Sequence, residues 1–287
     1  MIERVLASID RWAIVHGDNL ATMRAIPAGC AHLVYGDAPF NTGRDFTTDD
    51  GRPAYSDKWP SLDAFVEHVR ERCAAARDLL TDDGTLVVQV DPETSHYVKV
   101  ALDGVFGRDC FRNEIVWRYR RWPTPSRDFQ RMHDVLLRYT RHPERERWNQ
   151  LHEPRSTSTI ETWGHGRVLT KTVNGRRTTV RTDEPGVGTA MSDVWEVGII
   201  APSGNERLGY PTQKPRALVD RIVLACSLPG DLVLDPWCGS GTTMSAAVAH
   251  GRRAIGLDQS AVAVEIATAR LTRETLQRDW LAESGAA

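Results

Sequence analysis

Short apolar runs alternate with longer stretches of helical periodicity through most of this 287-residue chain. Two of the runs, Leu33–Tyr35 and Leu232–Leu234, are apolar on both faces, as in strands of a parallel sheet that is covered by helices. The alternation predicts an α/β layered fold. The expected strands are Ala13–His16, His32–Gly36, Thr85–Val90, Glu114–Trp117, Val135–Tyr139, Asp231–Leu234 and Ala254–Gly256. The expected helices are Asp63–Leu80, Arg216–Ser227, Thr242–His250 and Ala261–Trp280.

Two stretches interrupt this rhythm. Asn41–Pro60 is rich in Asp, Thr, Gly and Pro and follows a strand directly, which predicts a long irregular loop with a functional role. Arg121–Asp193 has weak periodicity and many Thr, Gly and Arg residues. The second stretch therefore indicates an insertion or a small subdomain.

The composition is that of a soluble globular enzyme, with 41% hydrophobic and 26% charged residues. No apolar run is long enough to span a bilayer, and the N-terminus lacks the pattern of a signal peptide, so we expect a cytoplasmic protein. The five cysteines form no CxxC pair and have no metal-ligand spacing. We therefore expect free, buried thiols and no metal site. The cysteines are Cys30, Cys73, Cys110, Cys226 and Cys238.

The net charge of −2 is unevenly distributed. Between Arg118 and Arg181 there are fifteen basic and six acidic residues, so this segment carries +9 and the remainder −11. A cationic block in an acidic chain is typical of contact with a polyanion, although arginines of a solvated loop would give the same count.

A glycine-rich turn follows one of the expected strands. Asp231–Thr243 has the sequence DLVLDPWCGSGTT, which predicts a strand, a tight turn with Gly239 and Gly241, and a helix capped by Thr242 or Thr243. N–H groups at such a helix start favour a carboxylate or a phosphate.

The spacing of this turn narrows the choice of ligand. It is not G-x-G-x-x-G, and no Lys follows as in a P-loop, which disfavours dinucleotides, triphosphates and a nicotinamide oxidoreductase. The next strand ends in Asp258, the place where a ribose diol is commonly held. Adenosine carrying a methionine tail fits this combination best.

A second candidate site lies in His32–Gly43, whose sequence is HLVYGDAPFNTG. The Asp37 carboxylate and the Ala38 carbonyl are two acceptors that could hold both N–H groups of an exocyclic base amine. Such contacts would pull the nitrogen toward tetrahedral geometry and aim its lone pair at an incoming methyl group. Phe40 could stack on a base that has left the duplex.

These residues carry a resemblance to a known family. DAPFNTG, YPTQKP at Tyr210–Pro215 and LDPWCGSGTT resemble, in this order, three motifs of the β class of S-adenosylmethionine-dependent DNA amino-methyltransferases. Further likeness extends over nearly the whole chain. The resemblance implies a Rossmann-like methyltransferase fold, with a mostly parallel seven-stranded sheet, helices on both faces and an inserted target-recognition region.

The resemblance also implies roles for individual residues. The catalytic tetrad would be Asp37, Ala38, Pro39 and Phe40. S-adenosylmethionine would lie against Asp18, Asp37, Thr212, Gln213, Lys214, Asp235, Trp237, Gly239, Ser240, Gly241, Thr242 and Asp258. Double-stranded DNA would contact Arg44, Arg118, Arg120, Arg121, Arg127, Lys171, Arg176 and Arg177.

Two positions depart from the family pattern. Ala38 replaces the usual Pro and should loosen its loop, because Pro fixes φ and Ala does not. Trp237 replaces the usual Phe. Neither change removes a chemical group, so we expect activity.

The expected organisation is residues 1–120 as the catalytic half, 121–195 as the target-recognition region, whose start includes the last sheet strand, and 196–287 as the cofactor half. The expected activity is methylation of adenine N6, with cytosine N4 as the alternative. RNA or protein glutamine as acceptor, and a catalytically silent DNA-binding relative, are further alternatives. A homodimer and a restriction endonuclease counterpart are possible partners in this family, and a cytoplasmic, nucleoid-associated location follows from the DNA substrate.

Overall fold

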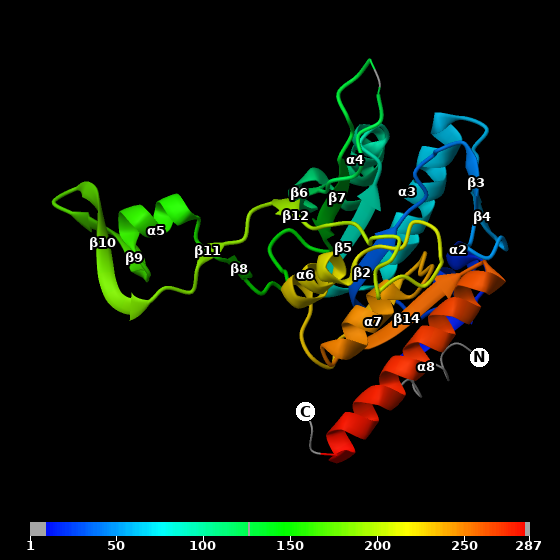
Figure 1. Ribbon diagram of the computed structural model, residues 1–287. Helices are drawn as coiled ribbons and strands as arrows, with labels where there is room; N and C mark the ends of the chain where they lie inside the picture. The colour runs from blue at the N-terminus through cyan, green and yellow to red at the C-terminus, as the bar shows by residue number, and fades with distance from the viewer. Residues whose placement is uncertain (1–9, 126, 285–287) are drawn as a thin grey trace. The chain divides into compact units, whose positions relative to one another are not determined.

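The structure is a computed structural model that describes residues 10–125 and 127–284 (Figure 1). The chain divides into two compact units, one of residues 1–149 and 193–287 and one of residues 150–192. No helix within the described ranges is both long and apolar enough to cross a membrane. Each unit is described by itself below.

An eight-stranded sheet forms the centre of the first unit, in the order β1-β14-β13-β2-β5-β7-β6-β12. The first five of these strands run parallel, β7 is antiparallel to both β5 and β6, and β12 is parallel to β6. In chain order the strands are β1 (Trp12–His16), β2 (Ala31–Asp37), β5 (Leu80–Val90), β6 (Phe111–Arg118), β7 (His133–Thr140), β12 (Val194–Glu196), β13 (Leu232–Asp235) and β14 (Arg253–Asp258).

All seven strands expected from the sequence belong to this sheet. The eighth, β12, has three residues, which is too short for an alternating pattern to be visible. It is held instead by parallel pairing with Val116–Arg118 of β6 and by the buried ring of Trp195.

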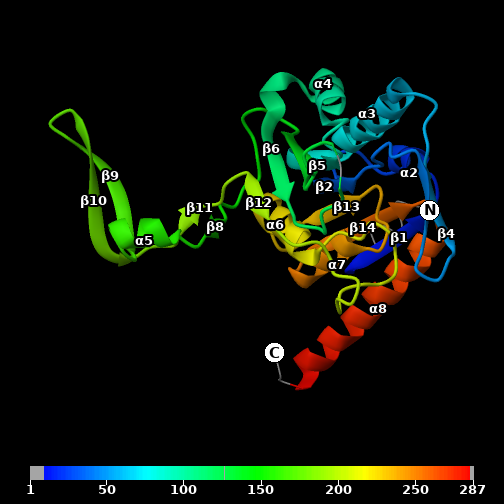
Figure 2. The ribbon, with the colours of Figure 1, turned by 45° about the horizontal axis from the view of Figure 1, so that its top comes forward.

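Helices cover both faces of the sheet (Figure 2). One face carries α2 (Asn19–Arg24), α3 (Leu62–Leu79) and α4 (Ser95–Phe106), and the other carries α6 (Arg216–Cys226), α7 (Thr242–Ala249) and α8 (Ala261–Ser284). A short 3-10 turn, η1 (Arg108–Cys110), follows α4. The mostly parallel sheet between two helical layers is the predicted fold.

Local sequence explains where α3 begins and which face it buries. Ser61 is its N-cap and accepts a hydrogen bond from the Ala64 amide at 3.1 Å. Phe65, Val69 and Cys73 recur at four-residue spacing and are buried in the main core. The four expected helices all form, within a few residues of their expected ends.

The segment Asn41–Pro60 is more regular than the sequence indicated. It contains an antiparallel hairpin of β3 (Arg44–Thr47) and β4 (Pro53–Asp57), so the expected irregular loop was wrong. Alternation is hard to detect in strands of four and five residues that are mostly exposed.

The second unit is small and largely exposed. It contains β8 (His152–Glu153), α5 (Thr157–Trp163), β9 (Gly166–Val173), β10 (Arg176–Pro185) and β11 (Thr189–Ala190). β9 and β10 form a hairpin, and none of the side chains of α5 is buried. The unit lies within the predicted insertion of residues 121–195, whose first part also supplies β7 to the sheet.

Candidate active site

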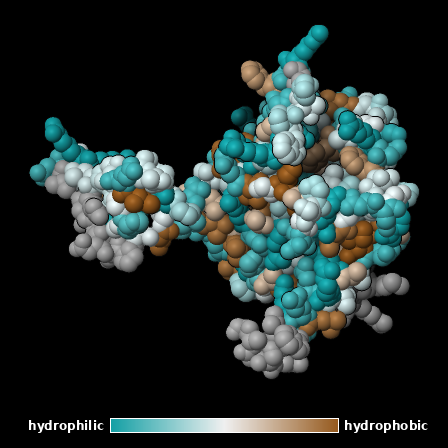
Figure 3. All heavy atoms as spheres, viewed as in Figure 1, coloured by the Kyte–Doolittle hydropathy of each residue, from teal (hydrophilic) through white to brown (hydrophobic). Residues whose placement is uncertain are grey.

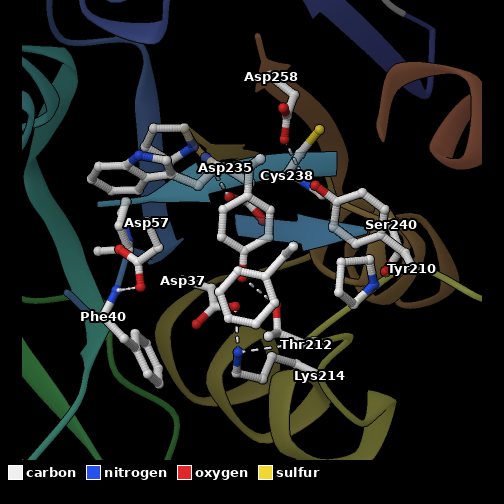
Figure 4. Close-up of a pocket in the computed structure, with 18 of the residues that line it drawn as sticks. Asp37, Phe40, Asp57, Tyr210, Thr212, Lys214, Asp235, Cys238, Ser240 and Asp258 are labelled. Atoms are coloured by element: carbon white, nitrogen blue, oxygen red, sulfur yellow. Dashed lines mark hydrogen bonds and ion pairs between the residues drawn. The ribbon is translucent and has the colours of Figure 1, made fainter. Parts of the chain in front are cut away.

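A cavity opens at the carboxyl ends of the parallel strands (Figure 4). Three adjacent strands end there in carboxylates, with Asp37 on β2, Asp235 on β13 and Asp258 on β14. The empty space is about 1200 Å³, counted out to open solvent. This edge of a doubly wound sheet is where such folds bind their ligands.

The predicted cofactor and catalytic residues gather around this one cavity. Lining it are Asp37, Ala38, Pro39, Phe40, Thr212, Gln213, Lys214, Asp235, Trp237, Gly239, Ser240, Thr242 and Asp258. Asp18 and Gly241 do not line it. Asp18 pairs with Arg72, which does line the cavity, and Gly241 is the residue just before helix α7 begins.

The glycine turn forms one wall of the cavity. Gly239 and Gly241 have φ values of +48° and +76°, so both need the freedom of glycine. A Cβ on Gly239 would lie 3.1 Å from the ring of Tyr210. Gly241 is the N-cap of α7 and no side chain caps the helix, so the expected threonine cap was wrong.

The Thr242 hydroxyl is instead engaged with its neighbours. It donates to the Lys214 carbonyl at 3.3 Å and accepts from the buried guanidinium of Arg270 at 2.9 Å. These contacts join the glycine turn to the segment that carries Lys214.

Asp258 is fixed by the backbone around it. Its carboxylate accepts hydrogen bonds from the amides of Gly239 and Ser260 at 2.9 and 2.8 Å. Burial raises the pKa of this carboxyl group, and the two amides oppose the rise. The side chain is therefore held rigidly at the cavity wall, beside the glycine turn.

Asp235 lies deeper, at the end of β13. It is buried, and its Oδ1 accepts from the Trp237 amide at 3.0 Å. Burial raises its pKa to about 7. A cationic ligand in the cavity would favour the ionised form of this group.

Asp37 has one occupied and one open carboxylate oxygen. Lys214 donates to Oδ2 and to the Thr212 carbonyl, as Figure 4 shows. Oδ1 is buried and has no hydrogen-bond partner among the described residues. Burial raises the pKa of Asp37, and the charge and hydrogen bond of Lys214 oppose the rise. A buried acceptor left open next to a cavity is suited to a donor supplied by a ligand.

The Lys214 ammonium also faces an aromatic ring. It lies 5.1 Å from the centroid of Phe40, within the range of a cation–π contact. The cation is therefore placed between Asp37 and Phe40, the first and last residues of the predicted tetrad.

A second aspartate, Asp57, anchors the chain that follows the tetrad. Its carboxylate accepts from the amides of Phe40, Asn41 and Thr42 at 3.3, 3.0 and 2.8 Å. It also accepts from the Thr42 hydroxyl at 2.7 Å and from the Trp59 indole at 3.0 Å. This anchor fixes Phe40, Asn41 and Thr42, and the loosening expected from Ala38 stays a prediction.

Sequence reasoning missed Asp57 and an aromatic group on the same hairpin. Phe46 and Tyr55 stack with ring centroids 4.8 Å apart, and Tyr55 faces Tyr210 at 6.4 Å. The Tyr55 hydroxyl is 3.1 Å from the Thr212 hydroxyl. The only signal in the sequence was Tyr210, within the YPTQKP motif.

Thr212 and Gln213 shape the segment before Lys214. Thr212 has a φ of +56°, which is uncommon outside glycine. The Gln213 side chain accepts from the Leu208 amide at 2.9 Å and donates to the Glu206 carbonyl at 2.7 Å. Gln213 thus ties its own loop while lining the cavity.

Asp18 reaches the cavity through another residue. Its carboxylate caps α2 by accepting from the Ala21 amide at 2.8 Å and pairs with Arg72 at 3.1 Å. Arg72 also donates to Asn19 at 2.6 Å, and Asn19 in turn donates to the Pro236 carbonyl at 2.8 Å. Both Asn19 and Arg72 line the cavity, and Arg72 was not predicted.

The basic block divides into structural and exposed arginines. Arg138 pairs with Glu146, Arg147 with Asp83 and Asp231, and Arg145 with Asp82, so part of the positive count serves the fold. The predicted DNA contacts Arg44, Arg118, Arg120, Arg121, Arg127, Arg176 and Arg177 are exposed, and Arg118 pairs with Glu196. The side chain of Lys171 lies outside the described residues.

The five cysteines are free, and four of them are buried. Cys238 lines the cavity, where burial raises the pKa of its thiol well above the usual value. Among the described residues, no group of three or more His, Cys, Asp or Glu side chains is arranged to hold a metal ion.

Comparison with curated proteins finds DNA methyltransferases. DNA adenine methyltransferase YhdJ of Escherichia coli (strain K12) is 28% identical over 262 residues, which cover 90% of this chain and 82% of the relative. Type II methyltransferase M.EcaI of Enterobacter cloacae is 29% identical over 309 residues, with coverage of 88% and 68%.

Solved structures share the fold. The PvuII DNA methyltransferase, which is cytosine-N4-specific, gives a TM-score of 0.64 at 14% identity over 90% of this chain and 86% of that one. A DNA modification methylase of Thermus thermophilus, TTHA0409, in complex with S-adenosyl-L-methionine, gives 0.58 at 20% identity over 91% and 93%.

A sequence model described as DNA methylase matches residues 31–269, which include the tetrad, the glycine turn and Asp258. The match covers most of the chain and agrees with the resemblance carried by the three motifs. This chain therefore belongs to the DNA methylase family, the S-adenosylmethionine-dependent methyltransferases of adenine N6 and cytosine N4.

Proposed function

We propose that this protein methylates the exocyclic amino group of a flipped base in duplex DNA, with adenine N6 as the target. The carrying observation is the open Oδ1 of Asp37, a buried acceptor beside the glycine turn. An adenine target is supported by Asp at the first tetrad position and by the relative that is named an adenine methyltransferase. Cytosine N4 is the alternative, because its amine needs the same two acceptors.

The residues of the cavity fit S-adenosylmethionine. Gly239 and Tyr210 line the cavity side by side, and Asp258 is a fixed acceptor for a ribose diol. Asp235 supplies a buried carboxyl group that a cation would keep ionised, and Thr212, Gln213 and Lys214 line the remaining wall. When bound, the cofactor supplies an electrophilic methyl group on a sulfonium.

Asp37 would act directly on the base. Its open Oδ1 accepts one N–H of the amine and the Ala38 carbonyl accepts the other, which aims the nitrogen lone pair into the cavity. The amine must also lose a proton. Asp37 is suited to take it, because burial raises the pKa of its carboxyl group and so makes the carboxylate a stronger base.

Lys214 would keep Asp37 in its active form. Its ammonium occupies Oδ2, which leaves Oδ1 for the base and favours the ionised carboxylate that accepts hydrogen bonds. The ring of Phe40 would stack on the base. Each of these roles acts on the nitrogen that is methylated.

DNA binding is proposed for the exposed arginines of both units. Replacing Arg176 and Arg177 with Gln should weaken binding of mixed-sequence duplex DNA and lower the salt slope, log K against log [salt], by about 2. Unchanged affinity would place the recognition surface elsewhere. A homodimer, a restriction endonuclease counterpart and a location with the bacterial nucleoid belong to the same proposal.

The test of the whole proposal is methylation of mixed-sequence duplex DNA with isotopically labelled donor, followed by nucleoside analysis and site mapping. Label in N6-methyladenine is the expected result, and label in N4-methylcytosine would establish the alternative. A folded protein that binds the donor and labels neither base would overturn the activity. Absence of donor binding would favour the catalytically silent relative.

A further inference from the structure

The loop that joins β6 to β7 leaves the sheet at the edge where Asp37 lies. β7 is antiparallel to β5, with Val135 opposite Val90, and Asp37 on β2 is opposite Gln89 of β5. The loop, residues 119–125 and 127–132, therefore springs from the carboxyl edge of the parallel strands, two strands from Asp37. Figure 1 shows it projecting beyond the sheet at the top of the view.

The base of this β6–β7 loop is connected to the cavity by buried polar groups. The Tyr119 hydroxyl donates to Asp134 at 2.9 Å, and Gln89 donates to the other oxygen of Asp134 at 2.8 Å. Tyr35, which lines the cavity, donates to Gln89 at 2.8 Å. The Tyr119 amide also donates to the Met132 carbonyl at 2.9 Å, which closes the loop at its base. The loop is thus rooted in the wall of the active site.

Two large rings are exposed on this loop. Trp122 is 93% exposed and Phe129 is 101% exposed, the highest values among the exposed large hydrophobic residues of the described chain. In Figure 3 most of the same projection is covered by hydrophilic residues. Rings kept in water on a projection, outside any core, are typical of a binding surface.

Charge identifies the kind of partner. From Arg118 to Met132 the sequence has five arginines and one acidic residue, and Arg120 and Arg121 immediately precede Trp122. A second copy of the loop would repel this one, whereas a polyanion would be attracted. Aromatic rings interleaved with arginines match nucleic acid, whose bases stack on rings and whose phosphates pair with arginines.

We propose that Trp122 and Phe129 enter the base stack of duplex DNA beside the target base and occupy the space that the base leaves when it moves to Asp37. This inference rests on the proposed function. An extruded base leaves a gap in the stack, and apolar or aromatic side chains inserted between base steps hold duplex DNA in such a distorted form. Because the loop is rooted beside the cavity, the rings act on the same stretch of DNA as the tetrad.

The experiment compares two mixed-sequence duplexes, one intact and one with a central abasic site, by fluorescence anisotropy at fixed salt. An abasic site provides the gap in advance, so the wild-type chain should bind that duplex on the order of tenfold more tightly. Trp122→Ala with Phe129→Ala should abolish this preference and leave binding of the intact duplex within about threefold, since the arginines that supply non-specific affinity remain.

Leu276→Ala is the matched control. Leu276 is 64% exposed on α8, an element that begins at the carboxyl edge and runs away from it. This variant should keep the wild-type preference. We expect all variants to have the Tm of the wild-type chain, because neither loop ring is buried.

Three results would overturn the proposal. They are equal binding of the two duplexes by the wild-type chain, an unchanged preference in the double variant, and a change of oligomeric state in the double variant, which would assign the rings to a second copy. The protein could prefer the abasic duplex only when both rings are present and yet methylate no DNA. This result would support the insertion of Trp122 and Phe129 into the base stack and reject the proposed activity.

Discussion

Asp37 directly precedes the segment Ala38–Thr42, and Asp57 binds the last three residues of this segment. The two carboxylates are used in opposite ways. Asp57 accepts five hydrogen bonds from backbone and side-chain donors, so both of its oxygens are filled. Asp37 has one oxygen on Lys214 and one that is buried and open. A carboxylate with every acceptor site filled fixes structure, whereas one with an unfilled site is prepared for a ligand.

Replacement of Asp37 tests whether its open carboxylate oxygen acts on the ligand. Asp37→Asn keeps the shape of the side chain but removes the charge, and we expect kcat to fall on the order of 10³-fold, as for the loss of a preorganised group at a reacting centre. Binding of the methyl donor, measured by calorimetry, should change only a few-fold. Asp45→Asn, on the exposed β3, is the control. Turnover retained within tenfold would reject the role of Asp37.

Replacement of Asp57 should act through structure. Asp57→Asn presents an amide to donors that need an acceptor, which should lower the free energy of unfolding by about 3 kcal/mol, since each unsatisfied buried donor costs about 1–3 kcal/mol. Urea denaturation measures this loss, and kcat should fall along with it. A variant that is as stable as wild type but inactive would show that Asp57 takes part in the reaction and is not only a structural anchor.

Replacement of Lys214 tests how the open oxygen is kept ionised. Asp37 must be ionised to accept, so activity is lost as pH falls through its pKa, which burial raises and Lys214 lowers. Lys214→Met should therefore move the acidic limb of the pH–rate profile to higher pH, with activity recovering as pH rises. Lys214→Arg should restore most of the wild-type profile. Equal loss at every pH would indicate a purely structural lysine.

Replacement of Asp235 should change how the stability of the donor-free chain depends on pH. Its pKa of about 7 in the folded chain exceeds the unfolded value of 3.8. Between these two pH values the folded chain binds more protons, so the stability from this group is present at low pH and is lost as pH rises. Asp235→Asn should thus raise Tm relative to wild type increasingly from pH 4 to pH 7. A constant difference over this window would contradict the raised pKa.

The difference between the two aspartates also marks the limit of sequence reasoning. The strands, four helices and the glycine turn were predictable, because each is encoded by residues close together in the chain. Asp57 was not, since its partners lie 15 to 17 residues earlier in sequence and are reached only when β4 pairs with β3.

The sequence also does not show which arginines are structural and which are exposed. A count of charge cannot distinguish Arg138, whose guanidinium is buried against Glu146, from Arg120, which is exposed. Arg72 carries no pattern at all, because it is one of several arginines on α3 and acquires its role from Asp18 and Asn19 across the core. Such partners become visible only when the layers are packed.

The contact between Gly36 and Trp237 has a practical consequence. A Cβ on Gly36 would lie 2.7 Å from the indole ring, so the two positions are sterically coupled and the large ring requires the missing side chain. Because Trp237 also lines the cavity, replacing it with Phe or Ala should enlarge the cavity next to the indole ring and leave Asp37 and Asp258 unchanged. This position is therefore the place to engineer tolerance for donor analogues that carry larger transferable groups.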